Sequence, residues 1–330
     1  MAGEVNLSVH YLFPPDAEYL DYLCGQLDPG ISLSTSDGES LPAETRILIA
    51  GRPKIEHLEA CPDLNALIIP WAGLPDITRD LMLGYPDLSV YNLHHNAAPV
   101  AELAFTLLLT ATKFIVPLDR ALRANDWRPR YKPNPSMLLK EKTALILGYG
   151  AIGRRLARLC QAMDMQVLAV KRNPDSQADE LVDEMYSLDA LPDLLPRSHV
   201  LLICLPLTPE TDGVIGAQEL DALPAGAVLV NVGRGPVVDE KALYHALRDG
   251  RLAAAGLDVW YNYPDDKEER ADTPPSAYPF HELDNVVLSP HRGGATMETN
   301  WLRMDGLASL LNAAAEGKII PNKVDVAAGY

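Results

Sequence analysis

The chain has few cysteines, a shortage of positive charge and no long hydrophobic run. Its four cysteines (Cys24, Cys61, Cys160 and Cys204) lack C-x-x-C spacing, so we expect neither a zinc site nor a disulfide framework, and a reducing cytosol fits best. Lysine and arginine number 28 against 45 acidic residues, for a formal net charge of −17. This balance argues against nucleic acid or an anionic membrane surface as a partner. Any anionic substrate must therefore be drawn in by local positive charge.

No apolar run reaches membrane-spanning length, and the N-terminal stretch MAGEVNLSVHYLFPP lacks the basic start and apolar core of a signal peptide. The sequence therefore predicts a soluble, cytoplasmic protein without a membrane partner. At 330 residues it is long enough for two domains.

Short apolar runs alternate with helical patterns along the chain. Such alternation predicts βαβ units and a mostly parallel sheet. A mostly apolar helical pattern over 100–125 is interrupted at Pro117, and the charged, proline-rich stretch 261–283 is expected to be a surface loop. The strand-like runs are VNLSVHYL, RILIAG, ALIIPWAG, MQVLAVKR, HVLLICLPL, AVLVNVG, AAGLDVW and NVVLSP.

The stretch ALILGYGAIG (144–153) is an apolar strand that runs directly into a glycine turn and then a helical pattern. Gly148, Gly150 and Gly153 have the G-x-G-x-x-G spacing of dinucleotide-binding folds. The first glycine permits the tight turn, the second lets the backbone approach a pyrophosphate, and the third lets the helix pack on the strand. The pyrophosphate would bind at the helix N-terminus, where the N–H groups are unpaired.

Several motifs occur in order and together resemble the D-isomer-specific 2-hydroxyacid dehydrogenase family over nearly the full length. They are NAAPVAELAFTLLL, GYGAIG, CLPLTPET (204–211), LVNVGRGPVVDEKALYHALRDGRLAAAGLDVW (229–260) and SPHRGG (289–294). The resemblance implies an α/β protein of two Rossmann-like, doubly wound parallel-sheet domains with a cleft between them. It implies a discontinuous substrate-binding domain (1–98 and 295–330), an NAD(P)-binding domain (99–294) and a homodimer joined through the cofactor domains. The apolar helix at 100–115 would supply hydrophobic surface for that pairing.

The resemblance assigns two catalytic side chains. Arg234 looks like the arginine whose two parallel hydrogen bonds hold and polarise a 2-oxo acid. His291, after an apolar strand, looks like the general acid/base that gives a proton to the carbonyl oxygen.

The third catalytic position departs from the family pattern. Where the family has a glutamate before a proline, this chain has Tyr263 before Pro264. A carboxylate beside a protonated histidine raises its pKa, whereas a neutral tyrosine supplies no charge. Asp265 and Asp266 follow, and we interpret them as solvated loop charges. We therefore expect His291 to titrate lower than in typical relatives, so that reduction favours mildly acidic pH.

The cofactor site has a second departure. At the end of the strand MQVLAVKR, where an acidic residue would bind the ribose 2′-hydroxyl of NAD, the chain has Lys171 and Arg172. These two cations favour NADP over NAD, with tolerance of either cofactor as the alternative. The other positions that match cofactor contacts are Tyr149, Ala151, Ile152, Leu205, Pro206, Thr211, Val232, Gly233, Asp258 and Gly293.

Candidate substrate contacts lie before the long helix. The family holds the substrate carboxylate with backbone N–H groups of a short loop, here Ala72, Gly73 and Leu74, and Trp71 is equally well interpreted as a pocket wall or a core residue. Asn96 is expected at the interdomain hinge or at the edge of the cofactor. His94 and His95 lack a third ligand at suitable spacing, so we expect no metal site.

The sequence therefore predicts an NAD(P)-dependent oxidoreductase that interconverts a small 2-oxo acid and a D-2-hydroxy acid by hydride transfer. Two alternatives remain open. One is a catalytically impaired protein that senses NAD(P)H, which the missing glutamate favours. The other is a dehydrogenase of a small anion such as formate or phosphite.

Overall fold

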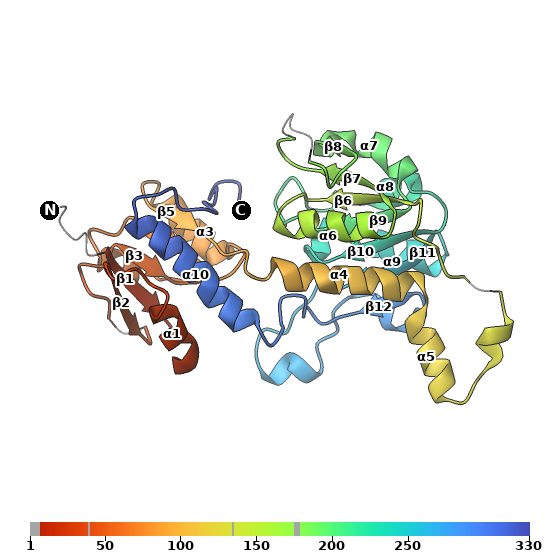
Figure 1. Ribbon diagram of the computed structural model, residues 1–330. Coiled ribbons are helices and arrows are strands. Elements are labelled where there is room, and N and C mark those ends of the chain that lie inside the picture. Colours follow the sequence, from red (N-terminus) through yellow and green to blue (C-terminus); the bar gives the residue numbers. More distant parts are fainter. Residues whose placement is uncertain (1–6, 39, 134, 175–178) are drawn as a thin grey trace. The chain divides into compact units, whose positions relative to one another are not determined.

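The computed structural model describes residues 7–38, 40–133, 135–174 and 179–330 (Figure 1). The chain divides into two compact units. We call Met1–Asn96 together with Ala295–Tyr330 the first unit, and Ala97–Gly294 the second unit. Each unit contains one parallel sheet with helices, so the predicted α/β class is confirmed.

The first unit is built on a five-stranded parallel sheet with the order β2-β1-β3-β4-β5. Alternate residues of each strand pack on opposite faces: Ile47 and Ile49 contact α1 and α10, whereas Leu48 faces α2 and α3. The strands are β1 (Leu7–Leu12), β2 (Ile31–Ser36), β3 (Ile47–Ile49), β4 (Ala66–Ile68) and β5 (Ser89–Tyr91). The helices are α1 (Ala17–Cys24), α2 (Ile55–Glu59), α3 (Asp76–Leu83) and α10 (Thr299–Ala315).

Helix α10 returns from the C-terminal part of the chain to cover the first sheet. The Trp301 ring packs edge-on against Tyr19 at 4.7 Å and Tyr22 at 4.9 Å between ring centroids. Met304 and Leu307 are fully buried in the same core. The first unit is therefore made from both ends of the chain.

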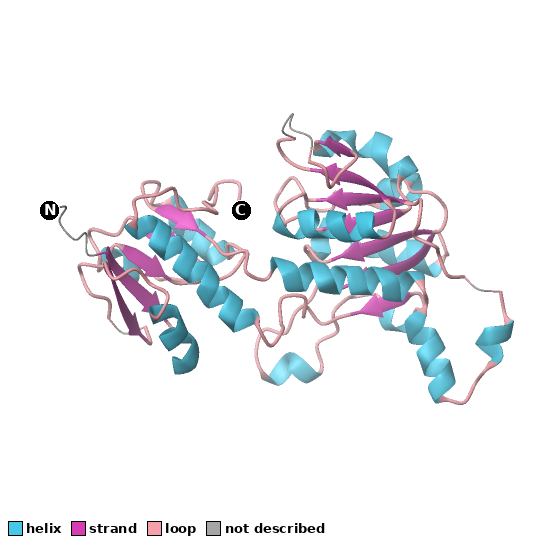
Figure 2. Ribbon diagram, in the orientation of Figure 1, coloured by secondary structure: helices cyan, strands magenta, loops and turns pink. Residues whose placement is uncertain are grey.

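The second unit is built on a seven-stranded parallel sheet with the order β12-β11-β10-β9-β6-β7-β8 (Figure 2). Helices cover both faces: Leu145 and Leu147 of β6 face one apolar layer, and Ala144 and Ile146 face the other. The strands are β6 (Thr143–Leu147), β7 (Gln166–Val170), β8 (Glu184–Tyr186), β9 (Val200–Ile203), β10 (Ala227–Asn231), β11 (Leu252–Leu257) and β12 (Val286–Leu288). The α-helices are α4 (Ala97–Thr112), α5 (Ile115–Arg123), α6 (Ala151–Ala162), α7 (Leu191–Leu194), α8 (Ala217–Ala222) and α9 (Glu240–Arg248). Short 3₁₀ turns are η1 (Arg128–Tyr131), η2 (Leu188–Ala190), η3 (Leu195–Arg197), η4 (Gly235–Val237), η5 (Glu268–Ala271) and η6 (Phe280–Glu282).

The helical pattern over 100–125 is broken, but not at Pro117. Helix α4 ends at Thr112 and α5 begins at Ile115, with a bend of 65° between them. Phe114 between them has the left-handed φ of 52°. Pro117 lies in the first turn of α5, where its missing N–H costs no hydrogen bond. The expected interruption was therefore placed three residues too late.

Helix α4 also exposes less apolar surface than expected. Its Ala104, Leu107 and Leu108 are buried against α6 and the sheet. Helix α5, by contrast, has no buried residue, and Figure 1 shows it projecting from the second unit. The hydrophobic surface of this region is thus on α5 and the segment after it, in the side chains of Ile115, Leu118, Leu122, Trp127, Tyr131 and Leu138.

Among the described residues, no single helix has both the length and the apolar composition to cross a membrane. Helices α4 and α5 pass that test only when they are taken together across their bend.

The loop 261–283 is largely on the surface, as predicted, but its second half is anchored. Phe280 is buried, and its ring packs 5.5 Å from that of Tyr244 and 6.3 Å from that of Trp260. Ser276 is also buried and donates a hydrogen bond to Glu240 Oε1 at 2.7 Å. Composition alone missed this anchor, because the aromatic side chain stands among charged residues.

The three glycines of the turn after β6 occupy different environments. Gly148 has a φ of 97°, which favours glycine. A Cβ at Gly153 would lie 2.2 Å from the carbonyl oxygen of Gly148, so the helix packs on the turn at backbone contact. A Cβ at Gly150 would meet nothing within 4 Å, which leaves open space in front of the N-terminus of α6.

This difference predicts different outcomes for two alanine substitutions. Gly153→Ala should lower the free energy of unfolding by about 1–3 kcal/mol, because overpacking against backbone outweighs the better helix propensity of alanine. Gly150→Ala is the matched control and should leave stability unchanged. Chemical denaturation of both variants measures the difference, and equal stabilities would contradict the packing argument.

Candidate active site

Five neighbouring strands of the second sheet direct their carboxyl ends to one edge. These are β6, β9, β10, β11 and β12, all parallel. Strand order reverses between β6 and β9, and ligands of open α/β sheets bind at such a switch point. The glycine turn, Arg234, Asp258 and His291 lie in the segments that follow β6, β10, β11 and β12, so the topology brings these segments to one edge.

The turn that carries Arg234 is fixed on both sides. Asn231, the last residue of β10, accepts a hydrogen bond from Gly233 N at 3.0 Å and donates one to the Arg234 carbonyl at 2.9 Å. A Cβ at Gly233 would lie 2.4 Å from the Leu205 carbonyl oxygen, so no larger residue fits there. The Arg234 side chain itself is exposed, and its Nη1 donates to the Gly233 carbonyl at 2.7 Å. The backbone is rigid while the guanidinium remains available.

The loop that carries His291 is held by Asp258, the first residue after β11. Asp258 is 2% exposed. Its carboxylate accepts hydrogen bonds from the Ser289 hydroxyl, from Arg292 N at 2.8 Å and from Gly293 N at 2.9 Å. His291 lies between these anchor points with a φ of 55°, a conformation rare outside glycine. The strained backbone is maintained because the buried carboxylate fixes both sides of it.

Tyr263 contacts His291 through its ring. The ring centroids are 5.5 Å apart at an angle of 57°. The Tyr263 hydroxyl instead accepts a hydrogen bond from Trp260 N at 3.1 Å. Tyr263 therefore packs on the imidazole, and its hydroxyl bonds to the backbone.

The two aspartates after Tyr263 interact within their own loop. Asp266 Oδ1 accepts from Glu269 N at 3.0 Å, and Asp265 N donates to Glu269 Oε2 at 3.1 Å. Both aspartates are exposed. Their contacts agree with the interpretation of solvated loop charges.

The electrostatic environment disfavours the charged form of His291. Partial burial of the ring and then the positive charge of Arg234 lower the pKa of His291 below its usual 6.5, and Asp258 opposes them. Burial raises the pKa of Tyr263, so its hydroxyl keeps its proton at neutral pH. The lowered pKa of His291 comes from burial and Arg234, and the protonated, neutral Tyr263 adds no negative charge to oppose them.

The glycine turn fits a dinucleotide. The open space at Gly150 lies at the N-terminus of α6, where the first N–H groups have no partner within the helix. Thr211 stabilises the neighbouring turn after β9 by donating to the Pro206 carbonyl at 2.7 Å and accepting from Thr208 N at 2.8 Å. Other cofactor candidates are spread over four turns. Tyr149, Ala151 and Ile152 lie in the glycine turn or the first turn of α6, Leu205 follows β9, Val232 and Gly233 follow β10, and Gly293 lies in the loop after β12.

Lys171 and Arg172 directly follow β7, at the position expected for contacts to the ribose. Sequence reasoning did not single out Asp179, which pairs with Arg154 Nε of α6 at 3.0 Å. Burial and Asp179 together raise the pKa of Tyr149 in the glycine turn.

The predicted substrate loop belongs to the first unit, after β4. Asn92 Nδ2 donates to the Ala72 carbonyl at 2.8 Å, and the Trp71 ring covers Gly51. Trp71 is 37% exposed, which places it at the surface and not in the core. Within the described part of the chain, the N–H groups of Ala72, Gly73 and Leu74 donate to no protein acceptor. Asn96 is the last residue of the N-terminal segment of this unit.

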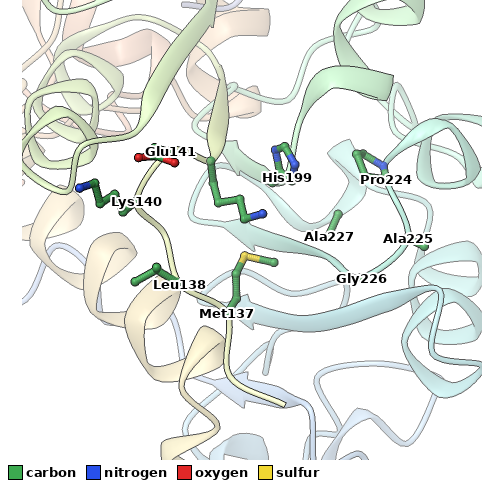
Figure 3. A pocket seen from close by; sticks show the side chains of 10 residues that line it. Met137, Leu138, Lys140, Glu141, His199, Pro224, Ala225, Gly226 and Ala227 are labelled. Carbon is green, nitrogen blue, oxygen red and sulfur yellow. The ribbon is translucent and has the colours of Figure 1, made fainter. Parts of the chain in front are cut away.

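A hollow of about 550 Å³ lies at the opposite, amino-terminal edge of the second sheet (Figure 3). His199 accepts a hydrogen bond from Thr143 N at 3.2 Å there, while the ends of Lys140 and Leu138 point away from it. Because it adjoins the starts of β6, β9 and β10, this hollow is separate from the candidate site.

Comparison with known proteins identifies the family. Residues 105–293 match the profile of "D-isomer specific 2-hydroxyacid dehydrogenase, NAD binding domain". The chain is 35% identical over 300 residues to a glyoxylate reductase of Pyrococcus furiosus, an alignment that covers 83% of this chain and 86% of that protein. The chain belongs to the D-isomer specific 2-hydroxyacid dehydrogenase family. The resemblance inferred from the motifs is thus confirmed.

Other relatives in the family give the same assignment. A glyoxylate reductase of Aeropyrum pernix is 40% identical over 231 residues, which cover 68% of this chain and 65% of the relative. The chain therefore spans slightly less than two thirds of that protein. A solved family member from Xanthobacter autotrophicus Py2, in complex with NADPH and MES, superposes with a TM-score of 0.78 at 27% identity, covering 99% of this chain and all of that one.

Sequence reasoning did not identify two positioning elements. One is Asn231, which fixes the turn of Arg234; the other is the clamp, the hydrogen bonds of Asp258 with Ser289 and the backbone of the His291 loop. The sequence gives only a weak indication that these residues position the site. Asn231 is an amide at the end of an apolar strand, and Ser289 follows the last strand of the sheet. Both are recognisable because a polar residue at the carboxyl end of a buried strand must find a hydrogen-bond partner.

Substitution of the clamp should affect stability and His291 together. Asp258→Asn should lower the free energy of unfolding by about 1.5–3 kcal/mol, because an amide cannot accept from both backbone N–H groups as a carboxylate does. It should also lower the pKa of His291, since the charge that raises this pKa is removed. Denaturation and an NMR titration of the imidazole measure both effects. Ser289→Ala is the control that keeps the charge, and its His291 pKa should remain that of the wild type.

Proposed function

We propose that the protein is an NAD(P)-dependent oxidoreductase that interconverts a small 2-oxo acid and a D-2-hydroxy acid. The observation that carries the proposal is the position of Arg234 and His291. They follow β10 and β12, on either side of β11, at the edge that carries the glycine turn. The charge of Arg234 acts directly on the titration of His291, so the two side chains share one environment.

Each side chain has a defined task in this reaction. The Arg234 guanidinium donates paired hydrogen bonds to the 2-oxo acid and polarises its carbonyl. The N–H groups of Ala72, Gly73 and Leu74 hold the carboxylate, with Trp71 as a wall of the pocket. His291 gives its proton to the carbonyl oxygen in reduction and takes it back in oxidation. The glycine turn at Gly148, Gly150 and Gly153 would hold a nicotinamide dinucleotide, which would supply the hydride chemistry; with the proton held by His291, the 2-oxo acid would become the 2-hydroxy acid.

NADP is the cofactor favoured by this proposal. NAD-preferring folds have an acidic side chain at the end of the second strand, which would repel a 2′-phosphate. This chain has Lys171 and Arg172 at that position instead. The relative from Xanthobacter autotrophicus Py2 binds NADPH, which supports the same preference. Glyoxylate reductases among the relatives support a small 2-oxo acid as the substrate.

A homodimer and a cytoplasmic location complete the proposal. Ile115, Leu118 and Leu122 of α5 expose apolar side chains that a second copy would cover. Sedimentation equilibrium distinguishes one copy from two. All four cysteines are free thiols, in agreement with a reducing compartment.

The reaction is tested by the oxidation of NADPH and NADH with glyoxylate, hydroxypyruvate, pyruvate and phenylpyruvate. We expect turnover with the wild type, a higher kcat/KM with NADPH, and a loss of at least about 10²-fold in kcat for His291→Ala. The exposed His281→Ala in the same unit is the matched control and should retain full activity. Tight cofactor binding without turnover on any of these acids would instead favour the NAD(P)H-sensing alternative. Oxidation of formate or phosphite, measured in parallel, would favour the small-anion alternative.

The missing carboxylate predicts a shift of the pH profile. Reduction requires protonated His291, so its rate falls as pH rises through the pKa of this group, which is lowered here. Tyr263→Glu should raise that pKa by roughly 1–3 units and extend reduction to higher pH. Tyr263→Phe keeps the ring contact without adding a charge and should leave the midpoint near that of the wild type. A profile of kcat/KM that is the same in all three proteins would show that His291 is not the titrating acid.

A further inference from the structure

A second cluster of polar side chains lies in the first unit, away from the residues assigned above. His95 follows β5, and Arg303 lies in α10. A Cβ at Gly306 would be 3.8 Å from the His95 Cβ, and Arg303 is one turn earlier on the same helix face. The neighbouring core includes Tyr11 of β1, whose pKa is influenced by the charge of Arg303. The cluster therefore joins the carboxyl ends of β1 and β5 to α10.

Two buried nitrogen atoms in this cluster have no hydrogen-bond partner. They are Nδ1 of His95 and Nε of Arg303. Buried polar atoms are almost always paired in folded proteins, and an unpaired one costs about 1–3 kcal/mol. No ion pair of Arg303 is found within the described residues, although acidic residues outnumber basic ones along the chain. Such an arrangement is expected where a ligand supplies the missing acceptor.

The charges in the cluster specify the kind of ligand. Burial, then the charge of Arg303 and then that of His94, lower the pKa of His95 to about 4. His95 is therefore neutral at physiological pH and offers one N–H donor, while Arg303 offers a positive charge and further donors. A guanidinium beside a neutral imidazole donor is suited to a carboxylate or a phosphate.

We propose that Arg303 and His95 form an oxyanion-binding site in the first unit, which takes a carboxylate or phosphate group. His95 lies two residues before the second unit begins, and Arg303 lies in α10, after the chain has returned to the first unit. The anion is either a second acidic group on the substrate or an independent ion. The first case rests on the proposed function, whereas the second does not.

Calorimetric titration of the full-length protein with inorganic phosphate tests the site without any turnover. We expect saturable binding that perturbs the His95 imidazole resonance, identified by its disappearance in His95→Gln. Arg303→Gln should weaken binding about tenfold or more. Arg46→Gln removes the same charge from an exposed position before β3, at the opposite edge of the same sheet, and should bind as the wild type does. Unchanged binding in Arg303→Gln would overturn the proposal.

Kinetics distinguish the two sources of the anion. If the site holds a substrate group, Arg303→Gln should lower kcat/KM about tenfold for oxaloacetate, which has a second carboxylate, and leave pyruvate unaffected. If the wild type binds phosphate and Arg303→Gln changes kcat/KM equally for oxaloacetate and pyruvate, the site holds an independent ion. Should Arg303→Gln fail to fold, Arg303→Lys keeps the charge without the planar fork and should still bind phosphate several-fold more weakly. Absence of both phosphate binding and oxaloacetate selectivity in the wild type would overturn the proposal even if pyruvate is reduced.

Discussion

The buried carboxylate of Asp258 is the interaction on which the candidate active site depends. Its backbone N–H donates to the Asn231 carbonyl at 3.0 Å, and its side chain accepts from the loop after β12. One connected set of hydrogen bonds therefore runs across the ends of β10, β11 and β12 and positions Arg234 and His291 together. A buried charge is costly, but three donors on one carboxylate offset that cost and enforce a strained conformation at His291. The precision of the site comes from this connection between strands, and not from any single loop.

Much of the fold follows from local sequence pattern. The buried strands of both sheets are apolar runs of the length and composition that predict strands, and the glycine turn is marked by spacing alone. The missed strands are β2, β5 and β8, all at sheet edges. Edge strands such as ISLSTS need no continuous apolar run, because one side of the strand and part of its faces remain in contact with solvent. The break between α4 and α5 was misplaced for a related reason: proline is tolerated in a first helical turn, so it does not by itself mark a helix end.

The candidate site was less accessible to sequence reasoning because its decisive contacts join distant segments. The sequence pattern predicts that Arg234 and His291 each follow an apolar strand, but it does not reveal that Asp258 holds the loop of His291 in place. Nor does it show that the Tyr263 hydroxyl bonds to Trp260 N and leaves only its ring for His291. His95 and Arg303 illustrate the same limit, since they approach each other only after α10 returns to the first sheet. In each case the residue type is informative, and the partner is determined by tertiary packing.

Tyr263 stands where the family resemblance implies a glutamate, and a neutral side chain at this position affects both how strong an acid His291 is and how much of it is protonated. A neighbouring carboxylate stabilises the imidazolium, which keeps the acid populated but makes it a weaker proton donor. Here burial and Arg234 act in the opposite direction, so the protonated form is scarcer at neutral pH and gives up its proton more readily. At a pH near the pKa of His291, the smaller protonated fraction and the greater acid strength partly cancel in the rate of reduction. At a pH far above this pKa, the loss of protonated His291 dominates. The ring contact of Tyr263 preserves the orientation of the imidazole while its charge support is absent. The missing glutamate should consequently narrow the pH range of reduction more than it lowers the maximum rate.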